Sequence, residues 1–140
     1  MSELNKALAA PHIYKFKDKE YKVSLVTNRV KAEFEKRMMH KAVQAARDMK
    51  TILEPDEYEM MLKKINDDYI AGRYAFESKF SVGAMQNPKG GFLTLCSVLF
   101  NTNEEEMYSI ILEDTLEVRA LIDTIITESF PDVKHGDEKN

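Results

Sequence analysis

The most apolar run of the chain is GGFLTLCSVLF, which occupies residues 90–100. It falls short of the roughly 20 consecutive apolar residues that a membrane-spanning helix needs. Thr94, Ser97 and the following Asn101 are spaced by three and then four residues, which places them on one narrow stripe of a helix. A short buried strand has a similar composition, but no other segment is typical of a parallel partner strand. The run therefore predicts a central helix that is buried on nearly all sides and wrapped by the others.

Length and composition describe one soluble globular domain. The 140 residues are enough for a single hydrophobic core. Hydrophobic and charged shares of 44% and 31% are usual for such a protein. The N-terminus lacks the long apolar segment of a secretory signal, which predicts a cytoplasmic location. The one cysteine, Cys96, lies inside the apolar run and is expected to be a buried thiol.

The segment HIYKFKDKEYKVSLVT, residues 12–27, predicts a β-hairpin. Aromatic or aliphatic residues alternate with lysine or serine on both sides of KDKE, so one face is apolar and the other carries lysines. The turn lacks Asn-Gly and Asp-Gly, which leaves its type open. Because an isolated hairpin is marginal in water, its apolar face must pack on helices or its edge must pair with another chain.

Two amphipathic helices are expected next. Thr27 or Asn28 can cap the first, in which apolar residues recur at helical spacing. Pro55 suits the first position of the second helix, and Gly72 suits its end. The tight connection between the two helices predicts an antiparallel pair.

The rest of the chain is helical in pattern. A short helix is expected before the breaker NPKGG, and two more follow the apolar run, the first of them with the acidic start NTNEEE. Pro131 ends the last helix, and residues 132–140 are expected to be disordered. The expected fold is mainly α, with a flexible arm over residues 1–11. A single domain over residues 12–131 then has an N-terminal β-hairpin followed by a bundle of about five helices around the central apolar helix.

Charge is divided unevenly along the chain. Residues 1–50 carry 12 lysines and arginines against 6 aspartates and glutamates, whereas residues 51–140 carry 8 against 18. Such a division can steer association with a partner or between copies of the same chain, which makes a homo-oligomer a hypothesis. The alternative is two solvated faces of opposite sign.

No constellation of catalytic, cofactor-binding or metal-ligating residues stands out. His12, His40 and His135 lack the spacing of a metal site, and no serine or cysteine has the context of a nucleophile. The glycine pair of NPKGG lacks the rest of a phosphate-binding loop. The acidic pair Asp67-Asp68 lacks EF-hand spacing, which favours a solvated surface over a cation site. We therefore expect no enzyme, no cofactor and no metal.

Lysines interleaved with aromatic residues, as in the predicted hairpin, can bind single-stranded nucleic acid. Here the alternation places the lysines and the rings on opposite faces, so the rings belong to the core. The chain is also acidic overall, with a net charge of −4. We expect binding to neither nucleic acid nor membranes.

Eight methionines are many for this length. Methionine fills irregular cores, and it also lines grooves that accept amphipathic helices of varied sequence. If a groove exists, the methionine and aromatic faces of the first two helices form it. The candidate partner-binding residues on these faces are Phe34, Met38, Met61 and Ile65. The same four residues fit a sealed core equally well.

The order of elements carries a resemblance to a known family. The strand pair YKFKDKEYKVS and the charged helix TNRVKAEFEKRMMHKAVQAA precede DDYIAGRYAFESKF. Then come the glycine-led apolar helix NPKGGFLTLCSVLF, the acidic start NEEEMYSIILED and the segment LEVRALIDTIITESFPD. This order resembles that of the tail assembly chaperones of long-tailed bacteriophages, and the resemblance covers residues 13–132.

The resemblance implies a non-enzymatic role in the host bacterial cytoplasm. Chaperones of this family bind the long, largely helical tape measure protein and keep it soluble until tail-tube subunits polymerise around it. An apolar groove or hairpin edge with a charged exterior would serve that task. The alternative is another small helical phage protein, either a virion component or an adaptor that inhibits a host protein. A partner of fixed stoichiometry would distinguish this alternative from a chaperone.

Overall fold

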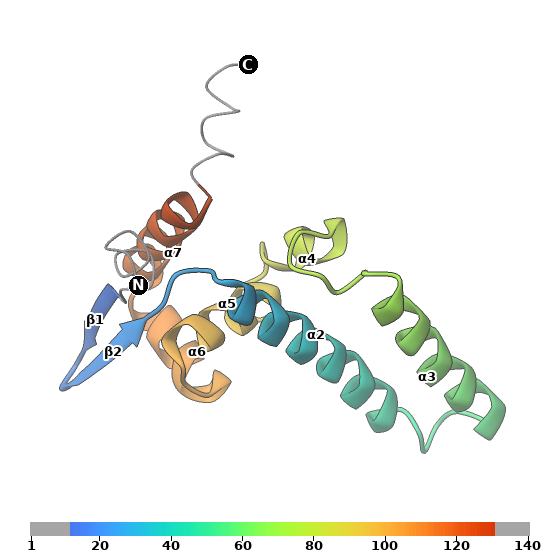
Figure 1. Cartoon of the computed structure of the whole chain (residues 1–140). Coiled ribbons are helices and arrows are strands. Elements are labelled where there is room, and N and C mark those ends of the chain that lie inside the picture. The colour runs from blue at the N-terminus through green and yellow to red at the C-terminus, as the bar shows by residue number, and fades with distance from the viewer. Residues whose placement is uncertain (1–11, 131–140) are drawn as a thin grey trace. The chain divides into compact units, whose positions relative to one another are not determined.

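The computed structural model describes residues 12–130, which form a two-stranded β-hairpin followed by six helices (Figure 1). The elements are β1 (His12–Phe16), β2 (Lys19–Val23), α2 (Asn28–Asp48), α3 (Pro55–Ile70), α4 (Lys79–Ala84), α5 (Gly91–Phe100), α6 (Glu104–Glu113) and α7 (Thr115–Ser129). The predicted class, mainly α with an N-terminal hairpin, is confirmed, and the six helices of residues 12–130 are the predicted apolar helix, α5, and five others. The expected arm over residues 1–11 and tail over residues 132–140 lie outside the described residues.

The chain divides into two compact units. One, called the hairpin unit, combines the residues up to Val30 with those from Leu95 onward. The other, called the α3 unit, is Lys31–Thr94. The boundaries fall inside α2 and α5, so each of these helices contributes to both units. The single domain over residues 12–131 stays a prediction.

The hairpin has the two faces that the alternation predicted. β1 and β2 pair antiparallel with Tyr14 opposite Tyr21. The rings of both tyrosines meet that of Phe100 in α5, with centroids 5.4 and 5.7 Å apart. Lys15 and Lys22 are exposed on the other face. The apolar face therefore packs on a helix of the same unit, as a two-stranded sheet requires for stability.

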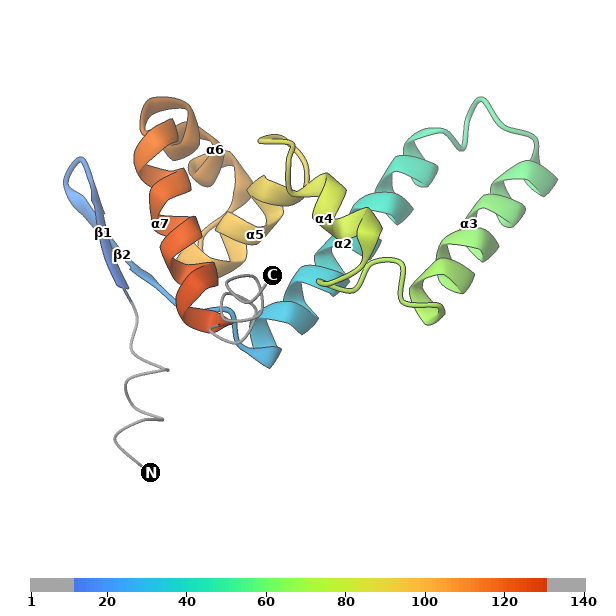
Figure 2. The same ribbon diagram turned by 90° about the horizontal axis from the view of Figure 1, so that it is seen from above.

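Ion pairs also join the hairpin to α6, and in Figure 2 the strands lie beside α7. Lys17 Nζ lies 3.6 Å from Glu113 Oε1. Lys19 Nζ lies 3.1 Å from Glu106 Oε1. Because these pairs are at the surface, they add little net stability. Most of the free energy that holds the hairpin in place therefore comes from its buried rings.

α5 is the buried helix that the apolar run predicted. All its residues are buried except Val98, which is half-buried. Thr94 and Ser97 of the polar stripe are fully buried too, and the Thr94 hydroxyl donates to the carbonyl oxygen of Gly90 over 3.3 Å. A hydroxyl that bonds back to its own helix can lie in a core without losing its hydrogen bond. None of the helices in residues 12–130 is long and apolar enough to cross a membrane.

α2 begins at a predicted cap and contributes a buried aromatic side chain to the core of the α3 unit. The Thr27 hydroxyl accepts a hydrogen bond from the amide of Val30 over 3.2 Å, which satisfies one free donor at the start of the helix. Farther along, Phe34 is fully buried, and its ring meets that of Phe76 edge-on with centroids 5.6 Å apart. This aromatic pair belongs wholly to the α3 unit.

α3 is much less buried than α2. It begins at the predicted Pro55 with a capping box, and it runs beside α2 in the opposite direction, as the short connection predicted (Figure 1, Figure 2). Ile65 is its one buried residue. Tyr58, Met61 and Leu62, which precede Ile65 at helical spacing, are half-buried. Much of this helix therefore faces solvent.

The predicted breaker NPKGG lies between α4 and α5, and its second glycine is required by packing. A Cβ at Gly91 would lie 2.8 Å from the backbone carbonyl carbon of Ala84 and 2.9 Å from the Cβ of Ala84. Real Cβ atoms do not approach so closely, so only glycine fits without a shift of α4. The glycine pair therefore serves helix packing within the α3 unit.

Candidate protein-binding surfaces

The four candidate partner-binding residues lie on α2 and α3, and three of them are buried. Phe34, Met38 and Ile65 expose 0%, 7% and 9% of their surface. Met61 is half-buried. An enclosed side chain offers no surface to a partner unless the fold rearranges. These positions favour the alternative that the sequence left open, in which the faces belong to the core.

Other large apolar side chains of the α3 unit are exposed. Ile52, Met60 and Ile70 expose 77%, 71% and 75% of their surface. Further exposed side chains in the same stretch are Met49, Tyr69, Phe80 and Val82. Full burial of an isoleucine or methionine side chain is worth about 1.5–3 kcal/mol. The α3 unit therefore holds apolar surface whose burial against a partner would be favourable.

A hollow of about 420 Å³ lies at the connection between α2 and α3. Its lining residues are Lys50, Leu53, Pro55, Tyr58, Glu59 and Leu62. Lys50 Nζ lies 5.4 Å from the centre of the Tyr58 ring, a cation–π contact at the edge of the hollow. Apolar and aromatic residues with charged ones beside them suit one face of an amphipathic helix.

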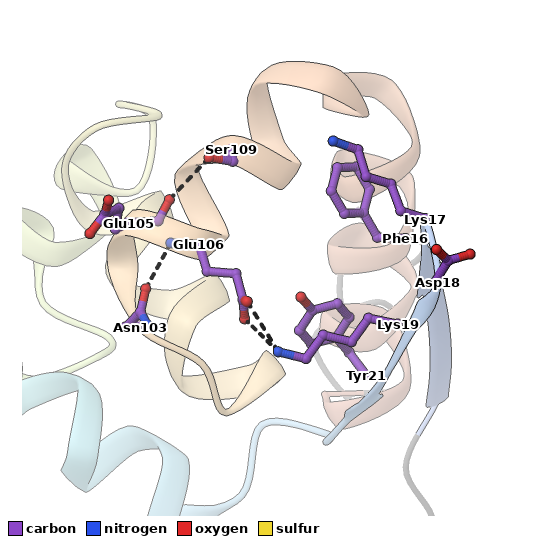
Figure 3. Close-up of a pocket in the computed structure, with 9 residues that line it drawn as sticks. All are labelled: Phe16, Lys17, Asp18, Lys19, Tyr21, Asn103, Glu105, Glu106 and Ser109. Carbon is purple, nitrogen blue, oxygen red and sulfur yellow. Dashed lines mark hydrogen bonds and ion pairs between the residues drawn. The ribbon is translucent and has the colours of Figure 1, made fainter.

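A second hollow, of about 710 Å³, opens between the tip of the hairpin and the start of α6 (Figure 3). Its lining residues are Phe16, Lys17, Asp18, Lys19, Tyr21, Asn103, Glu105, Glu106 and Ser109. In Figure 3, Lys19 reaches toward Glu106 while Asp18 points away from the hollow. Charges of both signs line it, so the lining does not select one class of small ligand.

Glu106 joins the hairpin to the start of α6. Lys19 Nζ lies 3.1 and 3.3 Å from its two carboxylate oxygens, and the Thr102 hydroxyl also donates to it. Its amide donates to the side chain of Asn103 over 2.7 Å, which caps α6. The hydrogen bond from Thr102, followed by that from Lys19, lowers the pKa of Glu106. A carboxylate kept ionised by these donors is a structural link and a poor general base.

Tyr14 links β1 to a segment far along the chain. Its hydroxyl donates to Asp114 Oδ2, between α6 and α7, over 2.5 Å. Burial, followed by the hydrogen bond to Asp114 and the charge of that carboxylate, raises the pKa of Tyr14 well above its ordinary value of 10.0. The phenol therefore stays protonated in the folded chain at pH values where an exposed tyrosine ionises.

Replacing Tyr14 with phenylalanine should lower the free energy of unfolding by about 1–2 kcal/mol at neutral pH, because a hydrogen bond to a charged group is lost. In the wild type, the raised pKa contributes stability that is complete below about pH 10 and declines as the pH rises further. The variant lacks this decline at position 14. The two unfolding free energies should therefore converge above about pH 10 in urea titrations followed by circular dichroism.

Tyr69→Phe is the matched control for this experiment, because Tyr69 is exposed on α3. Its free energy of unfolding should stay within about 0.5 kcal/mol of the wild type at neutral pH. A Tyr14→Phe variant as stable as the wild type at pH 7 would contradict a stabilising role for the bond to Asp114.

Residues 12–130 hold no arrangement typical of a metal site: no three histidine, cysteine, aspartate or glutamate side chains gather as a metal ion requires. Asp67 and Asp68 lie 3.0 and 3.3 Å from lysines of their own helix. Cys96 is fully buried, as predicted, and burial raises the pKa of its thiol to about 12. A thiol so protected is not a nucleophile at neutral pH. His135 lies outside the described residues, and the absence of enzyme activity stays a prediction.

The exposure of Ile52, Met60 and Ile70 was not predicted from helical periodicity. Periodicity assigns apolar residues to the buried stripe of a helix. Met60 and Ile70 are five residues before and after Ile65, which places each of them about 140° around the helix from it. The sequence therefore indicated these exposed positions only as apolar residues that lie outside the apolar stripe of the helix.

The described residues thus include exposed apolar side chains in the α3 unit and a hollow with a charged lining in the hairpin unit. Comparison of the chain with protein-family models, with curated proteins and with solved structures finds no match.

Proposed function

We propose that the chain is a non-enzymatic tail assembly chaperone of a long-tailed bacteriophage, which binds the tape measure protein through its α3 unit. The observation that carries the proposal is the exposure of Ile52, Met60 and Ile70. Single exposed apolar residues are common on proteins. Here they occupy one helix and the connection before it, where a hollow lined by Leu53, Tyr58 and other residues opens. The order of elements in the sequence supports the choice of partner.

Reversible binding follows from the size of this surface. Each exposed isoleucine or methionine that a partner buries contributes about 1.5–3 kcal/mol. Association itself costs about 4–15 kcal/mol, so a few such anchors leave a modest net affinity. A chaperone needs that balance, because tail-tube subunits must later displace it from the tape measure protein.

Co-expression with the tape measure protein from the genome that encodes this chain tests the proposal. The tape measure protein should stay soluble and copurify with several copies of the chain, which native mass spectrometry counts. A variant that combines Ile52→Lys and Met60→Lys should recover at least about tenfold less tape measure protein, because it places charges where anchors are buried. Both positions are exposed, so the fold should remain intact by circular dichroism.

Leu116→Lys is the matched control. Leu116 is 79% exposed and lies in the hairpin unit, so the variant places one lysine at an equally exposed apolar position, against two in the double variant. It should recover as much tape measure protein as the wild type. Full recovery with the Ile52 and Met60 double variant would overturn binding through the α3 unit. One host protein bound at a fixed ratio, or the chain itself in purified virions, would instead support the adaptor or virion component.

A further inference from the structure

The outer edge of β2 is open at Glu20 and Lys22, and it is closed just beyond the strand, where the Ser24 amide donates to the carbonyl oxygen of Leu99 over 3.1 Å. The sheet has two strands, and Phe16 and Lys19 face each other across its turn. A pair that closes a two-residue turn is hydrogen-bonded, and hydrogen-bonded and non-hydrogen-bonded pairs alternate from there. Glu20 and Lys22 therefore point their backbone N–H and C=O groups away from β1. Within residues 12–130, no backbone hydrogen bond from another element reaches either residue.

The side chains of Glu20 and Lys22 give this edge a self-complementary charge pattern. Both are exposed, and because they are two residues apart they lie on the same outward face of the hairpin. When two copies of β2 run antiparallel about a twofold axis at Tyr21, Glu20 of each copy stands opposite Lys22 of the other. The outward backbone groups of Glu20 then meet those of Lys22, so charge and hydrogen bonding favour the same register.

We propose that β2 pairs along this edge with β2 of a second copy of the chain, which gives a four-stranded sheet across a twofold axis. Each Glu20–Lys22 pair then exchanges two backbone hydrogen bonds and forms an ion pair. In Figure 3, Lys19 and Tyr21 of β2 border the open hollow beside α6, and neither Glu20 nor Lys22 belongs to its lining. The pairing uses only the hairpin unit and does not depend on the proposed function of the α3 unit.

The charge pattern favours a second copy over an unrelated strand. In an antiparallel pair of identical strands, the acid of each copy faces the base of the other. The edge of β1 has no such pattern, because its outward side chains are Ile13 and Lys15. The paired segment is short and exposed, so the association is weak and salt weakens it further.

Sedimentation velocity of the full chain over a concentration series, at about 50 mM and about 300 mM salt, tests the pairing. The wild type should dimerise reversibly, and more strongly at low salt. Glu20→Lys and Lys22→Glu each place like charges opposite one another at both pairs, so each should weaken dimerisation at least about tenfold. The double exchange Glu20→Lys with Lys22→Glu restores opposite charges and should restore the dimer. A mixture of the two single variants should also dimerise.

Glu117→Lys is the matched control, because it makes the same charge change at an exposed site on α7. It should leave dimerisation unchanged. A wild type that stays monomeric up to about 300 µM at low salt would overturn the proposal. Single variants that dimerise like the wild type, or a double exchange that fails to recover while its circular dichroism shows a folded chain, would overturn it as well.

Discussion

Replacing Phe34 with alanine should lower the free energy of unfolding by about 3–5 kcal/mol. Phe34 is fully buried, and its ring packs edge-on against that of Phe76 with centroids 5.6 Å apart. The variant loses the transfer of a large side chain from water, leaves a cavity, and gives up an aromatic pair worth about 0.5–1.5 kcal/mol. Since domains of this size have only about 5–15 kcal/mol of stability, urea titrations should find the variant close to unfolding.

Ile70→Ala is the control in the same unit. Ile70 is 75% exposed, so its truncation should change the free energy of unfolding by less than about 0.5 kcal/mol. A Phe34→Ala variant that keeps wild-type stability but no longer binds its partner would contradict the core position. It would restore the interpretation in which Phe34 lines a groove.

Replacing Phe100 with alanine should cost a similar amount, about 3–5 kcal/mol, and should also release the hairpin. Phe100 is 2% exposed, and both Tyr14 and Tyr21 pack against its ring. A two-stranded hairpin is marginal without such support. Hydrogen exchange followed by mass spectrometry should therefore show faster exchange of the β1 and β2 amides in the variant, in addition to lower global stability.

Leu112→Ala is the control for Phe100, because Leu112 is 62% exposed in the same unit. Its stability should stay within about 0.5 kcal/mol of the wild type, and its hairpin amides should exchange at the wild-type rate. Unchanged exchange in β1 and β2 of the Phe100→Ala variant would show that surface ion pairs, and not the buried rings, hold the hairpin.

Local patterns were sufficient to predict the elements. The alternation in β1 and β2, the Thr27 cap, Pro55 at the start of α3 and the spacing of Thr94 and Ser97 are all short-range features with one dominant structural solution. Each depends on residues within a few positions of one another. This is why the mainly α class and the N-terminal hairpin could be predicted.

Contacts between distant segments could not be predicted from the same patterns. The bond from Tyr14 to Asp114 joins residues 100 positions apart, and no periodicity relates them. The same holds for Lys19 and Glu106, which stand 87 positions apart. Knowing that a hairpin has an apolar face does not tell which helix covers it.

The candidate binding residues show a different limit. An apolar stripe on a helix has the same sequence whether the rest of the chain buries it or a partner protein binds to it. Phe34 and Met38 are buried by the chain itself. The exposed Ile52 and Met60 were visible in the sequence only as apolar residues outside a stripe, a weak signal because such residues are also common on surfaces.

Binding through the α3 unit can be tested by hydrogen exchange of the chain alone and of the chain in complex with the tape measure protein. Peptides that cover residues 49–70, where exposed apolar side chains and the 420 Å³ hollow lie, should exchange more slowly in the complex. Exchange in β1, β2, α6 and α7 should stay the same. Protection confined to the hairpin unit, or no change in residues 49–70, would contradict binding through the α3 unit.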